Sequence, residues 1–162
     1  MLAIESSCDE TAVAIIDADG KMLANQVSTQ IDFHARFGGV VPEIASRKHV
    51  EVIVSVVDAA LEDAAASLGL EGGAIAPSEL AAVGVTQGPG LVGALVVGVA
   101  FAKGFAYAAG KPLVCVNHLE GHLFANLLAR PDLNPPFIFT LVSGGHTMLV
   151  HVKAWGDYEV LG

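Results

Sequence analysis

Basic residues are scarce in this chain, and their scarcity argues against one large class of functions. Only 8 of its 162 residues are Lys or Arg, against 17 Asp or Glu, so the formal net charge is −9 at pH 7. Surfaces that bind nucleic acids are built from clustered basic residues. The longest basic run here is the pair Arg47-Lys48, which does not by itself indicate such a surface.

Cysteines are also few, and no secretory leader pattern opens the sequence. Cys8 and Cys115 cannot form a disulfide framework, so we expect a reducing, cytoplasmic location. Hydrophobic residues make up 53% of the chain, which is enough to bury the core of a domain and argues against disorder. Residues 91–109 are apolar enough for a membrane span, but Lys103 interrupts them. We interpret this stretch as a buried or partner-facing helix and expect no membrane.

Apolar runs and turn residues predict an α/β fold. Strands are expected over residues 2–5, 11–16 and 21–29 as an antiparallel meander, followed by a loop over residues 30–40. An amphipathic helix is expected over residues 42–68. Further strands are expected over residues 80–86, 113–116, 137–142, 147–153 and 158–160, and further helices over residues 91–109 and 118–129. The run 113–116 is wholly apolar and therefore predicts a buried strand.

Two histidines, His118 and His122, stand four residues apart at the start of the last predicted helix. Residues at this spacing share one helix face, so two imidazoles could bind one metal ion, although they would make only half a site. Ordinary helical histidines remain the alternative. The zincin protease pattern does not fit, because Glu120 follows His118 by two residues, about 200° around the helix. The remaining histidines have no assigned role: His34, His49, His146 and His151.

Two polar turns each join a pair of predicted strands, a layout similar to that of actin-like ATPases and sugar kinases. The first turn contains Asp9 and Glu10, whose carboxylates could orient a metal-bound phosphate or act as a base; a solvated turn is the alternative. The second is Ser143-Gly144-Gly145, where glycines would let backbone N–H groups approach a phosphate closely. An ordinary hairpin turn is the alternative there.

Five stretches, taken in order through the whole chain, are IESSCDET at residues 4–11, GGVVPE and ASR within residues 34–49, GPGL at residues 88–91, HLEGH at residues 118–122 and VSGGHT at residues 142–147. Together they resemble the TsaD family of tRNA threonylcarbamoyladenosine transferases. The resemblance implies an actin-like ATPase fold, of which residues 1–162 would be the N-terminal lobe, with a mixed sheet flanked by helices. It also implies a cytoplasmic enzyme.

The activity that the resemblance implies is transfer of a threonylcarbamoyl group from its adenylate to an amine of tRNA. The acceptor would be the N6 amine of the adenosine next to the anticodon, in tRNAs that read ANN codons. His118 and His122 would bind one divalent metal ion, Fe²⁺ or Zn²⁺, while Asp9 and Glu10 match an acidic pair linked to activity. The implied loop for the adenylate, an ATP-type ligand, consists of Leu141, Val142, Ser143, Gly144 and Gly145.

The resemblance also implies partners, and the chain departs from the family in two respects. Partners would be tRNA, a shorter actin-like paralogue expected to pack on residues 42–68 and 91–109, and a small ATPase. Family members are longer, and their third metal ligand, an aspartate, belongs to a second lobe. Leu141 stands where archaeal relatives have a tyrosine that reaches the metal. We therefore expect this chain alone to bind metal weakly or not at all, and not to catalyse. A metal-dependent protease and a non-catalytic actin-like scaffold are the alternatives.

Overall fold

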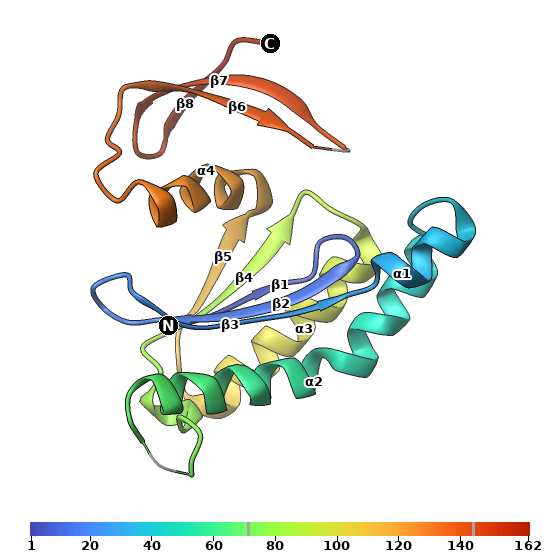
Figure 1. Cartoon of the computed structure of the whole chain (residues 1–162), viewed down its shortest axis with the longest axis vertical. Coiled ribbons are helices and arrows are strands. Elements are labelled where there is room, and N and C mark those ends of the chain that lie inside the picture. The colour runs from blue at the N-terminus through green and yellow to red at the C-terminus, as the bar shows by residue number, and fades with distance from the viewer. Residues whose placement is uncertain (71, 144) are drawn as a thin grey trace. The chain divides into compact units, whose positions relative to one another are not determined.

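The computed structural model describes residues 1–70, 72–143 and 145–162, and the chain forms two compact units (Figure 1). The first unit is Met1–His118 and the second is Leu119–Gly162. Gly144, which the family resemblance places in the adenylate loop, lies outside the described residues.

The first unit contains a five-stranded mixed sheet with strand order β3-β2-β1-β4-β5. β1, β2 and β3 form the predicted antiparallel meander, whereas β1, β4 and β5 run parallel to one another. The carboxyl ends of these three parallel strands therefore lie at the same edge of the sheet, where α/β proteins commonly place their functional residues. The strands are β1 (Leu2–Glu5), β2 (Glu10–Ile16), β3 (Met22–Thr29), β4 (Val83–Gly88) and β5 (Leu113–Asn117).

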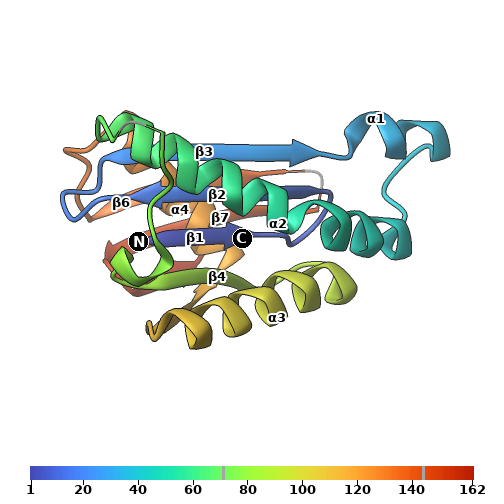
Figure 2. The same cartoon turned by 90° about the horizontal axis from the view of Figure 1, so that it is seen from below.

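Two long helices, α2 (Pro42–Ser67) and α3 (Val92–Ala109), cover one face of this sheet, as Figure 2 shows. α2 begins at a proline, whose missing N–H costs nothing in the first helical turn. Its buried residues recur every three or four positions, so one stripe of the helix faces the core. The core is formed by strand residues such as Leu2, Val13 and Val83 together with helix residues such as Ile53, Val57 and Ala102.

α3 buries a stripe of small residues spaced four apart, which lets the helix lie close to its neighbours. Its length and hydropathy alone would allow it to cross a membrane. Its buried face contributes to the core of the first unit, which agrees with the first of the two interpretations of this stretch, a buried or a partner-facing helix. The stripe consists of Ala94, Gly98, Ala102 and Ala106.

Two local predictions for the first unit were wrong, and the strand predicted over residues 80–86 is shifted to Val83–Gly88. Residues 30–40 are not a plain loop, because they contain α1 (Ile31–His34) and a short 3-10 helix, η1 (Ala35–Phe37). The carbonyl of Gln30 accepts hydrogen bonds from the N–H groups of Phe33 and His34, each at 3.0 Å, so the chain turns helical at once. The apolar run 113–116 is not a buried strand: β5 is an edge strand, and Val114 is 43% exposed.

The second unit combines one helix with a three-stranded antiparallel sheet of order β6-β7-β8. α4 (His118–Ala129) begins at the last residue of the first unit and has the bounds that the sequence predicted. The strands, β6 (Phe137–Val142), β7 (Thr147–Ala154) and β8 (Asp157–Val160), agree with the prediction to within one residue. Leu123, Val150 and Val152 form the small core of this unit.

Candidate functional site

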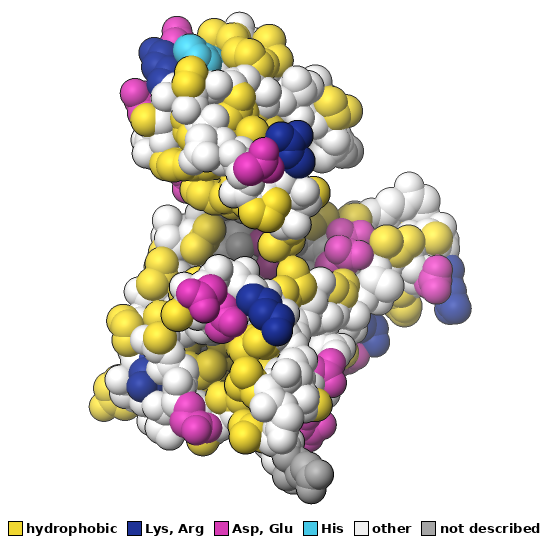
Figure 3. All heavy atoms as spheres, turned by 60° about the vertical axis from the view of Figure 1, so that its left-hand side comes forward, with side chains coloured by type: hydrophobic (Ala, Val, Ile, Leu, Met, Phe, Trp, Pro, Cys, Tyr) yellow, Lys and Arg dark blue, Asp and Glu magenta, His cyan; other side chains and the backbone are white. Residues whose placement is uncertain are grey.

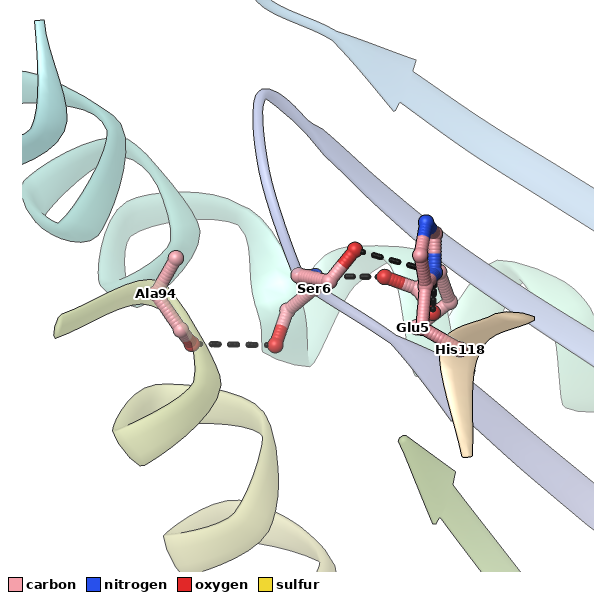
Figure 4. A network of polar contacts seen from close by, with 5 residues as sticks. Glu5, Ser6, Ala94 and His118 are labelled. Carbon is pink, nitrogen blue, oxygen red and sulfur yellow. Dashed lines mark hydrogen bonds and ion pairs between the residues drawn. The ribbon is translucent and has the colours of Figure 1, made fainter. Parts of the chain in front are cut away.

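The fold brings Glu5 to His118, the first histidine of the pair, although 113 positions separate them in the sequence. Glu5 is the last residue of β1, and His118 directly follows β5. Because both strands run parallel to β4, their carboxyl ends meet at one edge. The Oε2 of Glu5 lies 3.2 Å from the Nδ1 of His118 (Figure 4). Their side chains are 34% and 25% exposed, so the pair is reachable from solvent.

Both oxygens of the Glu5 carboxylate are held in place. Oε1 accepts a hydrogen bond from the backbone N–H of Ser7 at 2.5 Å, and the Oγ of Ser7 lies 3.2 Å from the same His118 Nδ1. A carboxylate and a bare ring nitrogen would face each other with lone pairs and repel, so Nδ1 carries the proton. In the neutral imidazole the lone pair then belongs to Nε2, the atom with which such a histidine binds metals.

The surroundings of Glu5 favour its ionised form. Burial by itself raises the pKa of Glu5. Hydrogen bonds from Ser7 and Thr86 and the proximity of His118 lower this pKa, and their combined effect is larger than that of burial. The net result is a pKa below the usual value for glutamate. Glu5 is therefore an acceptor for the His118 Nδ1–H at neutral pH.

Two kinds of nucleophile are disfavoured by the same geometry. A Ser-His-acid triad needs the serine and the carboxylate on opposite ring nitrogens, whereas Ser7 and Glu5 both contact Nδ1 of His118. The nearby Cys8 thiol has its pKa raised to about 11, first by burial and then by hydrogen bonding and the negative charge of Asp9. It is protonated at neutral pH, so Cys8 is not a thiolate nucleophile.

Helix α3 supports the segment that carries these groups. The hydroxyl of Ser6 donates to the carbonyl of Ala94 at 3.0 Å (Figure 4). The N–H of Leu91 donates to the carbonyl of Ser7 at 2.7 Å. A Cβ at Gly90 would lie 2.6 Å from the Ser7 carbonyl oxygen, and one at Gly98 would overlap the Ser6 hydroxyl. Only glycine at these positions lets the helix approach the segment so closely.

Helix α2 supports the same segment through His49, which is fully buried. Its Nε2 lies 3.1 Å from the Cys8 carbonyl oxygen, and its Nδ1 lies 2.7 Å from the Thr11 hydroxyl. Because a carbonyl only accepts, Nε2 is the protonated nitrogen and Nδ1 accepts the hydrogen bond from Thr11. His49 thereby holds residues on both sides of the acidic pair Asp9 and Glu10.

The structure places that acidic pair at the end of the first turn. Asp9 is half-buried, and its backbone carbonyl accepts a hydrogen bond from the Gln30 N–H at 3.0 Å. Glu10 is exposed at the first position of β2, opposite Thr29 of β3. Glu10 can therefore meet a ligand from solvent, as a general base must.

His122 lies one turn after His118 on α4, so the helix confirms the spacing on which the metal hypothesis depends. Within residues 1–70, 72–143 and 145–162, no group of three or more His, Cys, Asp or Glu side chains is arranged to hold a metal ion. Two imidazoles, one of them oriented by a carboxylate, are suitable donors for Fe²⁺ or Zn²⁺. The described residues thus fit two ligands of such an ion.

The predicted adenylate loop is the turn of the β6–β7 hairpin in the second unit. Leu141 is buried opposite Met148 of β7, and Val142 is exposed. The Ser143 N–H donates to the His146 carbonyl at 2.8 Å, and the His146 N–H donates to the Ser143 hydroxyl at 3.1 Å. Two N–H groups of the turn are therefore already used, which leaves the phosphate-binding and ordinary-hairpin interpretations both open.

Sequence reasoning missed Glu5, Ser7 and His49. One signal could have found Glu5: it is a carboxylate at the end of an apolar strand that a later parallel strand, ending just before His118, could join. Pairing of two parallel strands with a third between them brings their carboxyl ends together. No comparable pattern pointed to His49, whose role depends on which face α2 buries.

Comparisons with known proteins agree with the resemblance seen in the motifs. The model of the family described as TsaD, tRNA N6-adenosine threonylcarbamoyltransferase, matches residues 21–162. Proteins of that name from Clostridium botulinum and Clostridium novyi are each 53% identical to the chain, and one from Clostridium perfringens is 52% identical, in each case over all 162 residues. The chain covers 45% of the length of each relative, so it spans less than half of them.

Solved structures with the same fold support the predicted actin-like fold. YeaZ from Pseudomonas aeruginosa superimposes with a TM-score of 0.61 at 16% identity, covering 99% of this chain and 65% of that one. A second structure, described as similar to peptidase YeaZ from the same organism, gives a TM-score of 0.58 at 18% identity. The superposition covers 99% of this chain and 62% of that protein's chain. At these identities the likeness concerns the fold alone. Because the family model matches most of the chain, the chain belongs to the TsaD family of tRNA N6-adenosine threonylcarbamoyltransferases.

Proposed function

We propose that this chain supplies the histidine pair and the acidic turn of an enzyme that transfers a threonylcarbamoyl group to tRNA. The donor is the threonylcarbamoyl-adenylate, and the acceptor is the N6 amine of the adenosine next to the anticodon in tRNAs that read ANN codons. The observation that carries the proposal is the contact between Glu5 and the Nδ1 of His118, in a chain whose family is named for this reaction. This contact places the proton of the neutral His118 imidazole on Nδ1, so Nε2 is the nitrogen that would bind a metal ion.

His118 and His122 are the residues that would hold a divalent metal ion, Fe²⁺ or Zn²⁺. Such an ion, when bound, polarises the carbonyl under attack as a Lewis acid. Two protein ligands are fewer than most sites of this kind use, so the chain by itself should hold metal weakly and not catalyse. Dialysis of the chain against trace iron or zinc, followed by metal analysis, tests this point. Tight stoichiometric binding would contradict it.

The remaining predicted residues divide the other tasks. The Glu10 carboxylate, exposed at the start of β2, would accept the proton that the attacking amine loses, and Asp9 beside it would contribute negative charge. The predicted loop of Leu141, Val142, Ser143, Gly144 and Gly145 would hold the adenylate phosphate through backbone N–H groups. The acidic pair would thus serve the proton transfer, and the loop would position the phosphate end of the substrate.

Partners would supply what this chain lacks for tRNA. On the face drawn in Figure 3, dark blue Lys and Arg side chains stand singly, most of them beside magenta Asp or Glu. With a net charge of −9, the chain needs positive surface from elsewhere to bind an RNA backbone. We propose that other parts of the enzyme, the shorter actin-like paralogue and the small ATPase provide it in the cytoplasm.

The two alternative functions are less well supported. A metalloprotease of the zincin type needs its glutamate directly after the first histidine, whereas Glu120 on α4 is two residues beyond His118. A non-catalytic scaffold would not need the histidine pair or the carboxylate that orients His118.

A chimera tests the proposed function. The 162 residues of this chain would replace the aligned part of the Clostridium botulinum relative, with which they are 53% identical. We expect the chimera, assayed with its partner proteins, to form threonylcarbamoyladenosine in tRNA. A folded chimera that binds metal but forms no product would contradict the proposal.

A further inference from the structure

The carboxylate of Glu5 is placed to do more than balance the charge of a neighbour. Glu5 is the last residue of β1, which is the central strand of the five-stranded sheet. Its Oε1 is anchored by a hydrogen bond from the Ser7 N–H at 2.5 Å. Ser7 is itself 2% exposed and tied to α3 through its carbonyl, which accepts from Leu91 at 2.7 Å. The carboxylate therefore has little freedom to turn towards another partner.

Its second oxygen, Oε2, meets the Nδ1 of His118 at 3.2 Å. Both oxygens are thus engaged as acceptors, and neither is directed to serve as a metal ligand in place of a histidine. A hydrogen bond from Nδ1–H to a carboxylate fixes three properties of an imidazole: its tautomer, its ring orientation and the basicity of Nε2. A side chain in this position acts on a metal through the histidine.

We propose that Glu5 is a positioning residue, which holds His118 in the Nδ1–H tautomer and presents its Nε2 to the metal ion. Ser7 assists by anchoring the carboxylate and by placing its hydroxyl 3.2 Å from the same ring nitrogen. The inference rests on the proposed function in one respect, because the ion that Nε2 faces is the one proposed to bind His118 and His122. The tautomer itself is a property of this chain without any metal.

Nitrogen NMR of the imidazoles in the metal-free chain tests the first half of the proposal. Assigned at a pH where His118 is neutral, its ring should show a protonated Nδ1 and an unprotonated Nε2. Glu5→Ala should shift it towards the mixture of tautomers found in free histidine. The matched control is Glu62→Ala, which removes an exposed carboxylate from α2 and should leave the His118 signals unchanged. An Nδ1–H tautomer that persists fully in Glu5→Ala would overturn the proposal.

Titration with Zn²⁺ tests the second half in the chimera with the Clostridium botulinum relative. Loss of an outer-shell partner typically weakens metal binding 10- to 100-fold, so we expect about this loss in Glu5→Ala and none in Glu62→Ala. Glu5→Asp, which keeps the charge on a shorter side chain, should lose less affinity than Glu5→Ala. Equal affinity in Glu5→Ala and the unsubstituted chimera would overturn the positioning role. A chimera that bound no Zn²⁺ at all would instead refute the proposed metal site, and the tautomer measurement would still decide whether Glu5 positions His118.

Discussion

The imidazole of His49 and the hydroxyl of Thr11 lie 2.7 Å apart at a position closed to solvent. The other ring nitrogen of His49 donates to the Cys8 carbonyl, so one side chain of α2 holds the turn of β1 and β2 at two points. A buried polar group in a network of this kind stabilises the fold only while its partners remain.

Replacing His49 should therefore destabilise the protein. His49→Ala leaves a cavity and removes the partners of Thr11 and Cys8, at a cost of about 2–4 kcal/mol in the free energy of unfolding. Urea denaturation followed by circular dichroism measures this cost. His146→Ala, which removes an exposed imidazole, is the control and should change stability by less than about 0.5 kcal/mol. Equal stabilities of the two variants would show that the buried network contributes nothing.

Two glycines of α3 should respond in opposite directions to the same substitution. A methyl group at Gly98 would overlap the Ser6 hydroxyl, so Gly98→Ala should lower the free energy of unfolding by about 1–3 kcal/mol. Gly104 is exposed and has nothing within 4 Å of an added Cβ, so Gly104→Ala should raise it by up to about 1 kcal/mol through helix propensity. Urea denaturation of the two variants checks both signs. A stabilising Gly98→Ala would mean that α3 does not pack closely on Ser6.

The Cys8 thiol should react slowly at neutral pH. Its pKa is raised from 9.0 to about 11, so below pH 9 it holds about a hundredth of the usual fraction of thiolate. Since a more basic thiolate is also more nucleophilic, alkylation should be about 10- to 100-fold slower than for glutathione. In a Cys115→Ser chain the rate with iodoacetamide should keep rising to about pH 11. Asp9→Asn, which removes a nearby negative charge, should shift this profile to lower pH.

If the alkylation rate of Cys8 in the folded protein levelled off near pH 9, this result would contradict the environment described for the first turn. The experiment needs circular dichroism at each pH, so that only rates from folded protein are compared.

The exposed apolar stripes of α2 and α3 are where we propose that the shorter actin-like paralogue binds. Val54 is 56% exposed on α2 and Val96 is 59% exposed on α3, and each belongs to a row of exposed residues along its helix. An aspartate buried there would cost several kcal/mol, so Val54→Asp and Val96→Asp should abolish the complex in size-exclusion chromatography. Val27→Asp changes an exposed valine of β3 instead and should leave the complex intact. Complexes that survive both helix substitutions would place the interface elsewhere.

Much of the fold could be predicted from the sequence, because hydrophobic periodicity and turn residues determine secondary structure within short segments. The meander, α2, α3 and α4 were all confirmed, with bounds within about one residue. The strand at residues 113–116 was placed correctly but was wrongly expected to be buried, because an apolar run looks the same in a central and an edge strand. The helical start at Gln30 was missed because it depends on hydrogen bonds within a segment without clear periodicity.

The candidate site could be predicted only in part, for a related reason. The pair His118 and His122 is visible as a four-residue spacing on one helix. The contact of Glu5 with His118 depends on the strand order of the sheet, which places β1 on one side of β4 and β5 on the other. Strand order is set by long-range packing, and a local pattern does not contain it.

One measurement tests the central claim most directly: metal content and threonylcarbamoyladenosine formation in the chimera, compared with its His118→Ala variant. We expect His118→Ala to lose most of the bound metal and the product together. His151→Ala, which removes a histidine of β7, should lose neither. A His118→Ala chimera that formed product at the unsubstituted rate would contradict the account.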